Sequence, residues 1–280
     1  MQLGTLTIVG VGLIGGSVGL AARRRRVAAR VLGVARQQQT LDLARARGAI
    51  DAGFLDLAPA VKDADLIVFC TPVQLIAEQA RSAAGHCKRG AVLTDAGSTK
   101  APIVAALDGT LPAGVSFVGS HPLAGSEKRG PEHADAELFV NRLTVVTPTA
   151  ATDPHALETV CRFWQALGAR VKTMTPEAHD AALAMTSHVP HLLAAALAGA
   201  LPAELYELTA TGFRDTTRIA AGDPAVWTGI FTQNRRAVLE ALARVLAEVE
   251  RFRAALQAGD ETALASLLAH GKKVRDALGS

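Results

Sequence analysis

TLTIVGVGLIGGS, residues 5–17, joins an apolar strand pattern to three glycines in the order Gly-x-Gly-x-x-Gly. Gly10, Gly12 and Gly15 fall between the end of the predicted strand and the start of a helical pattern. The first glycine permits a tight turn, the second lets the backbone approach a diphosphate, and the third allows the helix to pack closely on the strand. The free N–H groups at the start of the helix favour an anion, so this stretch predicts a dinucleotide site.

The second predicted strand, residues 31–34, leads into Ala35-Arg36-Gln37. A site for NAD usually has an acidic residue here that binds the ribose hydroxyls. An arginine instead binds a 2′-phosphate through charge-assisted hydrogen bonds and stacks on adenine. Arg36 therefore favours NADP, and a solvated arginine beside bound NAD is the alternative. The other residues that we expect to contact the cofactor are Leu13, Ile14, Thr71 and Pro72.

Short apolar runs alternate with helical patterns through the first half of the chain. The predicted strands are residues 6–9, 31–34, 66–70, 91–94, 116–118 and 143–147, with a further strand through Val171. Helical patterns cover residues 14–25, 40–47 and 154–167. This alternation predicts an α/β fold with a doubly wound, mostly parallel sheet. Nearly every strand position is apolar, as expected when helices cover both faces.

Strand patterns end before Thr175, where Thr-Pro-Glu is typical of a helix start. We therefore expect one domain over residues 1–173 and an all-α domain over residues 174–280. In a predicted helix over residues 234–257, apolar side chains alternate at spacings of four and three: Val238, Leu242, Val245, Val249, Phe252 and Leu256. This seam is typical of a core-facing bundle helix or of a helix that also packs across a dimer. We favour a symmetric homodimer formed by the helical domain.

Composition excludes several classes of protein. The net charge of +3 is too small to indicate a nucleic-acid partner, and we expect no membrane partner because no long uncharged apolar run is present. The N-terminus lacks the basic-then-apolar pattern of a signal peptide. Three scattered cysteines fit a reducing cytoplasm and predict neither disulfides nor a metal site. These features predict a cytoplasmic protein.

A second conspicuous stretch is GSHPLAGSE, residues 119–127, which follows an apolar run. We expect His121 in a glycine-flanked turn at the carboxyl end of a strand, where ligands bind in open α/β sheets. Histidine suits a general base because its pKa lies near neutrality. Ser98 and Lys100 follow the preceding predicted strand and are expected near a nicotinamide.

The helical half carries further candidates. His188 and His191 lie in SHVPH, and Arg214 and Arg218 lie in FRDTTR. An arginine can bind a carboxylate through two hydrogen bonds, although Arg214 also fits a surface ion pair. A core position is favoured for His188 more than for His191. The remaining histidines are interpreted as surface or structural residues: His86, His133, His155, His179 and His270.

With GVGLIGGS, DAGSTK, GSHPLAGSE, SHVPH and DTTRIA in this order, the chain resembles the prephenate/arogenate dehydrogenase family. The resemblance runs from Thr5 to beyond Phe231. It implies a Rossmann domain followed by a helical dimerisation domain, with the active site in the cleft between them. It also implies oxidative decarboxylation of a cyclohexadienyl acid. Prephenate gives 4-hydroxyphenylpyruvate, and arogenate gives tyrosine.

The resemblance also implies roles for residues that match its motifs. His121 corresponds to the histidine that takes the proton of the ring 4-hydroxyl, and Ser98 to the serine that hydrogen-bonds this histidine and the hydroxyl. Arg218 corresponds to the arginine that binds a substrate carboxylate. His191 corresponds to a second histidine near the substrate side chain.

Ser126 and Glu127 correspond to residues that close over the ligand, and Asp215 is expected to orient Arg218 or its loop. Arg36 departs from the acidic residue of an NAD site, which puts NAD use in doubt. Two other functions stay open beside that of a prephenate/arogenate dehydrogenase. A β-hydroxyacid dehydrogenase typically has a catalytic lysine on the linker helix, but residues 176–201 contain none. A nucleotide sensor would need only the glycine loop. The choice between prephenate and arogenate also stays open.

Overall fold

The structure is a computed structural model that describes residues 2–125, 128 and 130–279. Its first part is an eight-stranded sheet in the order β3-β2-β1-β4-β5-β6-β7-β8. The strands are β1 (Leu3–Val9), β2 (Ala28–Val34), β3 (Ala52–Phe54), β4 (Leu66–Phe69), β5 (Val92–Asp95), β6 (Ser116–Pro122), β7 (Leu143–Thr147) and β8 (Arg170–Thr173). All neighbouring strands pair in parallel except β6 and β7. The predicted α/β fold with a mostly parallel sheet is confirmed.

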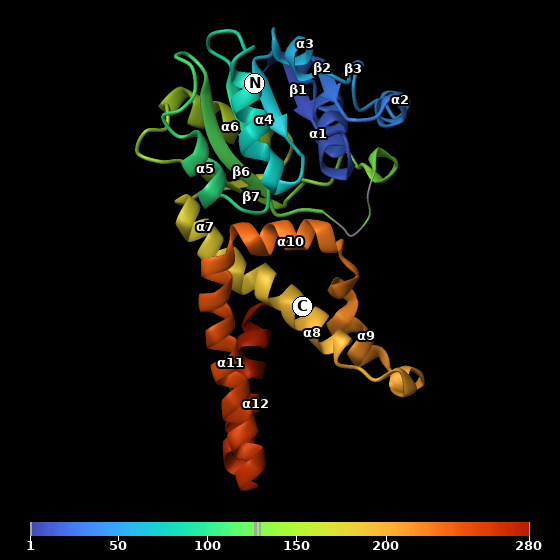
Figure 1. Ribbon diagram of the computed structural model, residues 1–280, viewed down its shortest axis with the longest axis vertical. Helices are drawn as coiled ribbons and strands as arrows, with labels where there is room; N and C mark the ends of the chain where they lie inside the picture. Colours follow the sequence, from blue (N-terminus) through green and yellow to red (C-terminus); the bar gives the residue numbers. More distant parts are fainter. Residues whose placement is uncertain (1, 126–127, 129, 280) are drawn as a thin grey trace.

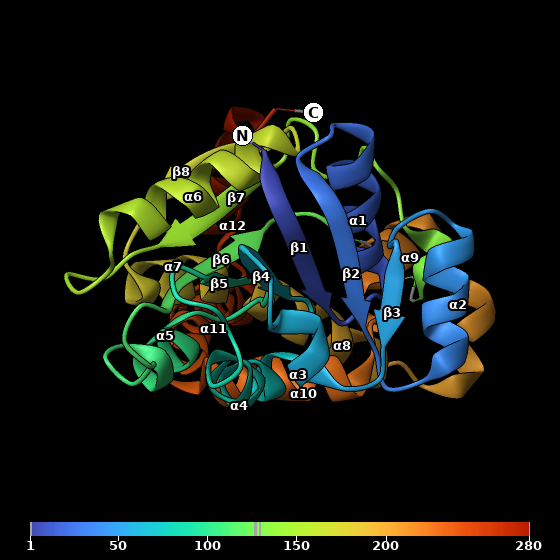
Figure 2. The ribbon, with the colours of Figure 1, turned by 90° about the horizontal axis from the view of Figure 1, so that it is seen from above.

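Helices cover both faces of the sheet, as Figure 2 shows from above. One face packs against α1 (Leu13–Arg24), α2 (Gln38–Ala46) and α6 (Pro154–Ala166). The other face packs against α3 (Leu57–Val61), α4 (Val73–Ala84) and α5 (Ala101–Leu107). Strand side chains alternate between the two cores: in β4, Leu66 and Val68 lie in the first and Ile67 and Phe69 in the second. Because β1, β2, β4, β5 and β6 pair in parallel, their carboxyl ends lie at the same edge of the sheet.

Four strands differ from the prediction by more than one residue. β1 and β2 each begin three residues earlier, at Leu3 and Ala28. The sequence pattern did not indicate β3, which has only three residues and a central glycine, Gly53. β6 is longer than predicted, because after pairing in parallel with β5 up to Val118 it pairs antiparallel with β7 from Gly119 to Pro122. His121 therefore lies within the last residues of a strand and not in a turn.

The second part of the chain is helical (Figure 1). It contains α7 (Pro176–Leu183), a π-helical turn η2 (Ala184–His188), α8 (Val189–Gly199), α9 (Thr211–Thr217), α10 (Pro224–Gln233), α11 (Arg235–Ala258) and α12 (Glu261–Ala277). It also has two short 3₁₀ turns, η3 (Ala203–Leu208) and η4 (Arg218–Ala221), and a third, η1 (Pro131–His133), lies between β6 and β7 in the first part. As predicted, Thr175 starts α7, with its Oγ1 accepting a hydrogen bond from the N–H of Ala178 at 3.1 Å.

The segment Pro176–Gly199 is one continuous helix of 24 residues with a mean hydropathy of 1.4 over its most apolar window. By length and composition alone it could cross a membrane, although polar residues such as Thr186, Ser187 and His188 interrupt its apolar run. Its polar residues His179 and Asp180 are buried, and both are hydrogen-bonded to the sheet domain. We interpret it as the helix that joins the two parts of the molecule.

The predicted seam of α11 is covered at one end only. Val238 is buried, whereas Val249 is 54% exposed and Leu256 is 65% exposed. Figure 1 shows α11 and α12 running side by side away from the rest of the molecule. Much of the apolar surface of these helices thus remains in contact with solvent in a single chain.

Candidate active site

The glycine loop has the backbone that its sequence predicts. Gly10 has φ +93°, a conformation that other residues rarely adopt, and a Cβ there would lie 2.9 Å from the carbonyl oxygen of Cys70. At Gly15 a Cβ would lie 2.9 Å from Cγ2 of Ile8, since α1 packs directly on β1. At Gly12, by contrast, a Cβ would meet no atom within 4 Å, so this backbone is open to a ligand.

The start of α1 also suits an anion. Its N-cap, Gly12, has no side chain to accept hydrogen bonds from the first free N–H groups. Leu13 and Ile14 form the first turn and are half-buried. A dinucleotide diphosphate therefore fits this loop, where it meets open backbone and the positive end of the helix dipole.

The other predicted cofactor residues lie along the same edge of the sheet. Arg36 is exposed just after β2. Thr71 follows β4 and reaches Gly10, where a Cβ would lie 2.9 Å from its Cγ2 atom. Its Oγ1 donates a hydrogen bond to Oε1 of Gln79 at 2.5 Å, and Pro72 is the exposed N-cap of α4. The ends of β1, β2 and β4 thus lie next to one another at one edge of the sheet.

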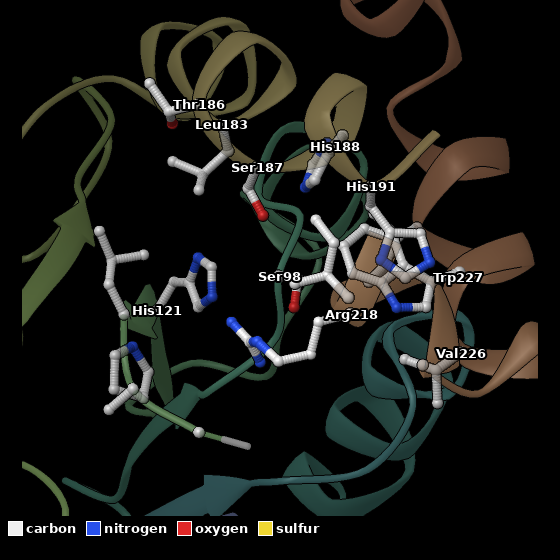
Figure 3. A pocket seen from close by; sticks show the side chains of 17 residues that line it. Ser98, His121, Leu183, Thr186, Ser187, His188, His191, Arg218, Val226 and Trp227 are labelled. Atoms are coloured by element: carbon white, nitrogen blue, oxygen red, sulfur yellow. The ribbon is translucent and has the colours of Figure 1, made fainter. Parts of the chain in front are cut away.

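A cleft of about 610 Å³ lies between this end of the sheet and the helical part (Figure 3). It brings together Ser98, His121, His191 and Arg218, four site residues that the sequence predicted. Its other walls are formed by Pro122, Leu123, Ala124, Gly125, Leu183, Thr186, Ser187, His188, Ile219, Gly222, Val226, Trp227 and Ile230. Residues that are 120 positions apart, such as Ser98 and Arg218, meet only because the helical part folds back over the sheet edge.

His121 forms its ring hydrogen bond with a residue that the sequence analysis did not select. Its Nδ1 lies 2.9 Å from Nε2 of His179, and within the described part of the chain it forms no hydrogen bond with Ser98. Burial, followed by repulsion from the protonated form of His179, from Lys100 and from the protonated form of His188, holds the pKa of His121 well below its usual range. The imidazole is therefore neutral at pH 7 and can accept a proton.

His179 was interpreted as a surface or structural residue, but the structure buries it completely. Its Nδ1 lies 2.8 Å from Oδ1 of Asp180. Asp180 in turn accepts hydrogen bonds from the N–H groups of Lys100 at 2.8 Å and Ala101 at 2.9 Å, at the start of α5. One signal was available: Pro176, His179, Asp180 and Leu183 have helical i, i+3, i+4, i+7 spacing, and all four are buried.

The expectation for Lys100 was wrong. This side chain is fully buried and forms an ion pair with the equally buried Asp95, so it does not reach the cleft. The Asp95 carboxylate also accepts hydrogen bonds from the N–H groups of Gly97 at 2.9 Å and Ser120 at 3.0 Å. Burial lowers the pKa of Lys100, and the Asp95 carboxylate opposes that shift. The pair connects the ends of β5 and β6 beneath the cleft.

The helical wall is built around two histidines. His191 is stacked on Trp227, with ring centroids 3.5 Å apart and planes 13° apart. His188 is buried, as a core histidine would be, and its Nδ1 lies 3.1 Å from Nδ2 of Asn234. Burial lowers the pKa of His188 to about 4. The π-helical turn η2 precedes Pro190, whose missing N–H cannot continue the α-helical bonding pattern.

Arg218 enters the cleft from η4, and Figure 3 shows its guanidinium reaching toward the space between His121 and Ser98. It is exposed, as is Asp215 on α9, and among the described residues these two side chains form no ion pair. Arg214 on the same helix is also exposed. The predicted residues Ser126 and Glu127 lie outside the described residues.

Within residues 2–125, 128 and 130–279, no group of three His, Cys, Asp or Glu side chains could hold a metal ion. The arrangement instead offers a neutral histidine, a hydroxyl group and a guanidinium around one cavity, next to a loop that suits a dinucleotide. These groups can accept a proton from a substrate hydroxyl and bind a substrate carboxylate, and so hold the substrate next to a hydride acceptor.

Comparisons with known proteins agree with this geometry. Residues 18–173 match the family model "Prephenate dehydrogenase, nucleotide-binding domain", and residues 175–270 match "Prephenate dehydrogenase, dimerization domain". The chain is 33% identical over 280 residues to the cyclohexadienyl dehydrogenase of Zymomonas mobilis, covering 98% of this chain and 95% of that protein. It is 34% identical over 284 residues to the prephenate dehydrogenase of Bacillus subtilis, covering 98% of this chain and 76% of that protein.

Two solved structures are also similar. The prephenate dehydrogenase of Aquifex aeolicus in complex with hydroxyphenyl propionate and NAD⁺ has a TM-score of 0.93 at 31% identity, covering 99% of both chains. The arogenate dehydrogenase of Synechocystis has a TM-score of 0.81 at 32% identity, covering 98% of this chain and 99% of that one.

Proposed function

We propose that this chain, which belongs to the prephenate dehydrogenase family, catalyses the oxidative decarboxylation of prephenate to 4-hydroxyphenylpyruvate. The observation that carries the proposal is the position of His121, which faces Arg218 across a cleft next to the glycine loop. The nicotinamide cofactor, when bound, accepts a hydride from the substrate. The remaining chemistry falls to the side chains of the cleft.

His121 is the base in this proposal. Since its Nδ1 is hydrogen-bonded to His179, Nε2 is the nitrogen left for the substrate. This nitrogen takes the proton of the ring 4-hydroxyl while hydride leaves the same carbon, which becomes a carbonyl. The bond from the ring to its carboxylate then breaks, its electron pair enters the ring, and carbon dioxide leaves. The carbonyl oxygen regains a proton as the ring becomes aromatic, which supplies much of the driving force.

The other side chains bind and orient the substrate. Arg218 binds a substrate carboxylate, for which the guanidinium geometry allows two parallel hydrogen bonds. Ser98 hydrogen-bonds the ring hydroxyl near His121, and His191, fixed by its stacking on Trp227, contacts the substrate side chain. We also propose, from the family resemblance, that Ser126 and Glu127 close over the ligand.

For the cofactor, we propose that the groove formed by Gly10, Gly12, Gly15, Leu13, Ile14, Thr71 and Pro72 binds NADP in preference to NAD. The preference rests on Arg36, which is exposed where a 2′-phosphate would lie. The Aquifex aeolicus relative was solved with NAD⁺, so use of NAD is the alternative.

We place the domain boundary between residues 173 and 174, at the end of β8. The dimerization-domain match and the exposed apolar side chains of α11 support a homodimer formed by the helical domain. We also propose a cytoplasmic location, which fits three free cysteines.

Arogenate dehydrogenase activity is the second candidate, since the Synechocystis relative has that name. Parallel steady-state assays of prephenate and arogenate, each with NADP⁺ and NAD⁺, test both. We expect reduced cofactor and 4-hydroxyphenylpyruvate from prephenate. Tyrosine formed only from arogenate would replace the first proposal with the second. Absence of turnover with both substrates would favour a nucleotide sensor.

A further inference from the structure

We propose that His179 and Asp180 are positioning residues that fix the tautomer of His121, so that its Nε2 faces the cleft as an unprotonated acceptor. This inference rests on the proposed function, because it assumes that His121 is the base. It adds two residues to the site that lie behind His121 and do not touch the substrate cavity. It also connects the base to a helix of the other domain, since both residues belong to α7.

The hydrogen bonds determine the direction of each proton. Asp180 accepts bonds from the N–H groups of Lys100 and Ala101, so its carboxylate acts as an acceptor. His179 Nδ1, 2.8 Å from the same carboxylate, must therefore donate its proton to Asp180. With this as the one proton on the His179 ring, Nε2 of His179 has a free electron pair. His121 Nδ1, 2.9 Å away, must donate to it.

The consequence is one allowed tautomer for the base. With its proton on Nδ1, His121 has a lone pair on Nε2, which is the nitrogen that faces the cavity. The opposite tautomer would place two lone pairs against each other between His121 and His179. Because His179 is fully buried, water cannot replace the missing donor. The two rings also meet edge to face, with centroids 5.1 Å apart, which fixes the orientation of His121.

Asp180 is itself anchored rather than free to rotate. Its Oδ1 accepts from Lys100 at 2.8 Å and its Oδ2 from Ala101 at 2.9 Å, so both oxygens bind the start of α5. Asn234, which lies between α10 and α11, donates a further hydrogen bond to the backbone carbonyl oxygen of Asp180 at 2.8 Å. The tautomer of the base thus depends on the docking of the helical domain on the sheet domain. Among residues 2–125, 128 and 130–279, the charged and titratable groups around His121 and His179 are Asp95, Lys100, Asp180, His188 and Arg218.

The first test replaces His179 by Phe and by Gln. Phe preserves an aromatic ring but cannot accept a hydrogen bond from His121 Nδ1, whereas the amide oxygen of Gln can accept that hydrogen bond. We expect kcat of His179→Phe to fall roughly 100-fold with KM changed less than about threefold, since a positioned base contributes about 10²- to 10⁴-fold. His179→Gln should restore kcat to within about tenfold of wild type. The control is His155→Phe at an exposed histidine of α6, which should leave kcat unchanged.

The second test changes which ring nitrogen of His179 and of His121 carries the proton. In Asp180→Asn, an NH₂ group in place of Oδ1 gives up the hydrogen bond from the N–H of Lys100 and donates to His179, which then accepts on Nδ1 and donates from Nε2. The remaining amide oxygen, in place of Oδ2, still accepts from Ala101. His121 would accept on Nδ1 and carry its proton on Nε2, toward the cavity. Nitrogen-15 NMR of histidine-labelled protein reports this directly. We expect the proton of His121 on Nδ1 in wild type and on Nε2 in Asp180→Asn, whose kcat should fall at least about 100-fold.

The outcomes separate the inference from the proposed function. Three results would each overturn the inference that His179 and Asp180 fix the tautomer of His121. They are a proton on Nε2 of His121 in the wild type, equal kcat for wild type and His179→Phe, and equal loss of kcat in the Phe and Gln variants. If wild type turns over neither substrate, the proposed function fails, but the NMR experiment still decides the tautomer. If His179→Phe does not fold, the wild-type spectrum and the Gln variant keep the test complete.

Discussion

Gly12 and Gly15 belong to one sequence motif, but the structure predicts opposite consequences for their replacement by alanine. At Gly15 a Cβ would overlap the carbonyl oxygen of Gly10, and it would lie 2.9 Å from Cγ2 of Ile8 and 3.0 Å from the carbonyl carbon of Gly10. Carbon atoms in contact prefer separations of about 3.5–4.0 Å. α1 must therefore move from β1 by roughly half an ångström or more. At Gly12 a Cβ meets no protein atom within 4 Å.

The cost of the overpacked site can be estimated from these contacts. Added methyl groups in a well-packed core cost about 1–3 kcal/mol. At about 2–4 °C per kcal/mol, the melting temperature of Gly15→Ala should fall by roughly 2–12 °C without cofactor. Gly12→Ala should lose less stability, because a Cβ there meets no atom within 4 Å and only the poorer capping by alanine, about 0.5–1 kcal/mol, acts against it.

Dinucleotide binding should show the reverse order. The new methyl group of Gly12→Ala occupies the side from which the diphosphate approaches, so we expect affinity to fall about tenfold or more, equivalent to about 1.4 kcal/mol. Thermal unfolding without ligand and calorimetric titration with NADP⁺ and NAD⁺ measure the two effects. If Gly12→Ala binds both cofactors like wild type, or if Gly15→Ala retains wild-type stability, our account of the loop is wrong.

Three further predictions concern the cofactor, pH and assembly. Arg36→Asp should weaken NADP⁺ binding relative to NAD⁺, and unchanged NADP⁺ affinity would refute a 2′-phosphate contact. Burial lowers the pKa of His188 in the folded protein to about 4, from about 6.5 for a histidine in the unfolded chain, so this side chain is neutral at pH 7. Below pH 6.5 the unfolded chain binds the extra proton, so the free energy of unfolding should drop as pH falls toward 4, by up to about 3 kcal/mol. Urea unfolding of wild type and His188→Asn tests this, and parallel pH curves would contradict it. Leu256→Glu should convert a dimer to monomers in light scattering, because it places a charge on the exposed apolar face of α11; an unchanged mass excludes this surface.

The parts of the fold that the sequence predicted well depend on local chemistry. The β1–glycine–α1 unit needs only an apolar strand, three glycines and a helix start, and all lie within residues 5–17. The cap at Thr175 is equally local. The extension of β6 was missed because it depends on antiparallel pairing with β7, for which residues 119–122 carry no apolar signal.

The candidate site was predicted only in part for a related reason. Ser98, His121, His191 and Arg218 stand in recognisable motifs, and all four line the cleft. His179 is 58 positions from His121, so their hydrogen bond depends on the docking of two domains and leaves no local pattern.

Lys100 shows the opposite error. A lysine after a strand resembles a ligand-binding residue, but a partner five positions earlier, Asp95, turns its ammonium into the sheet. Burial of an ion pair is a property of the tertiary structure, which residue spacing does not reveal.

We propose His121 as the base of a dehydrogenase that acts on prephenate. The most direct measurement compares wild type with His121→Asn in reduced-cofactor formation from prephenate, with cofactor affinity measured separately. We expect the variant to bind the dinucleotide like wild type and to lose about 10²- to 10⁴-fold in kcat. Turnover of the variant at the wild-type rate would contradict the account.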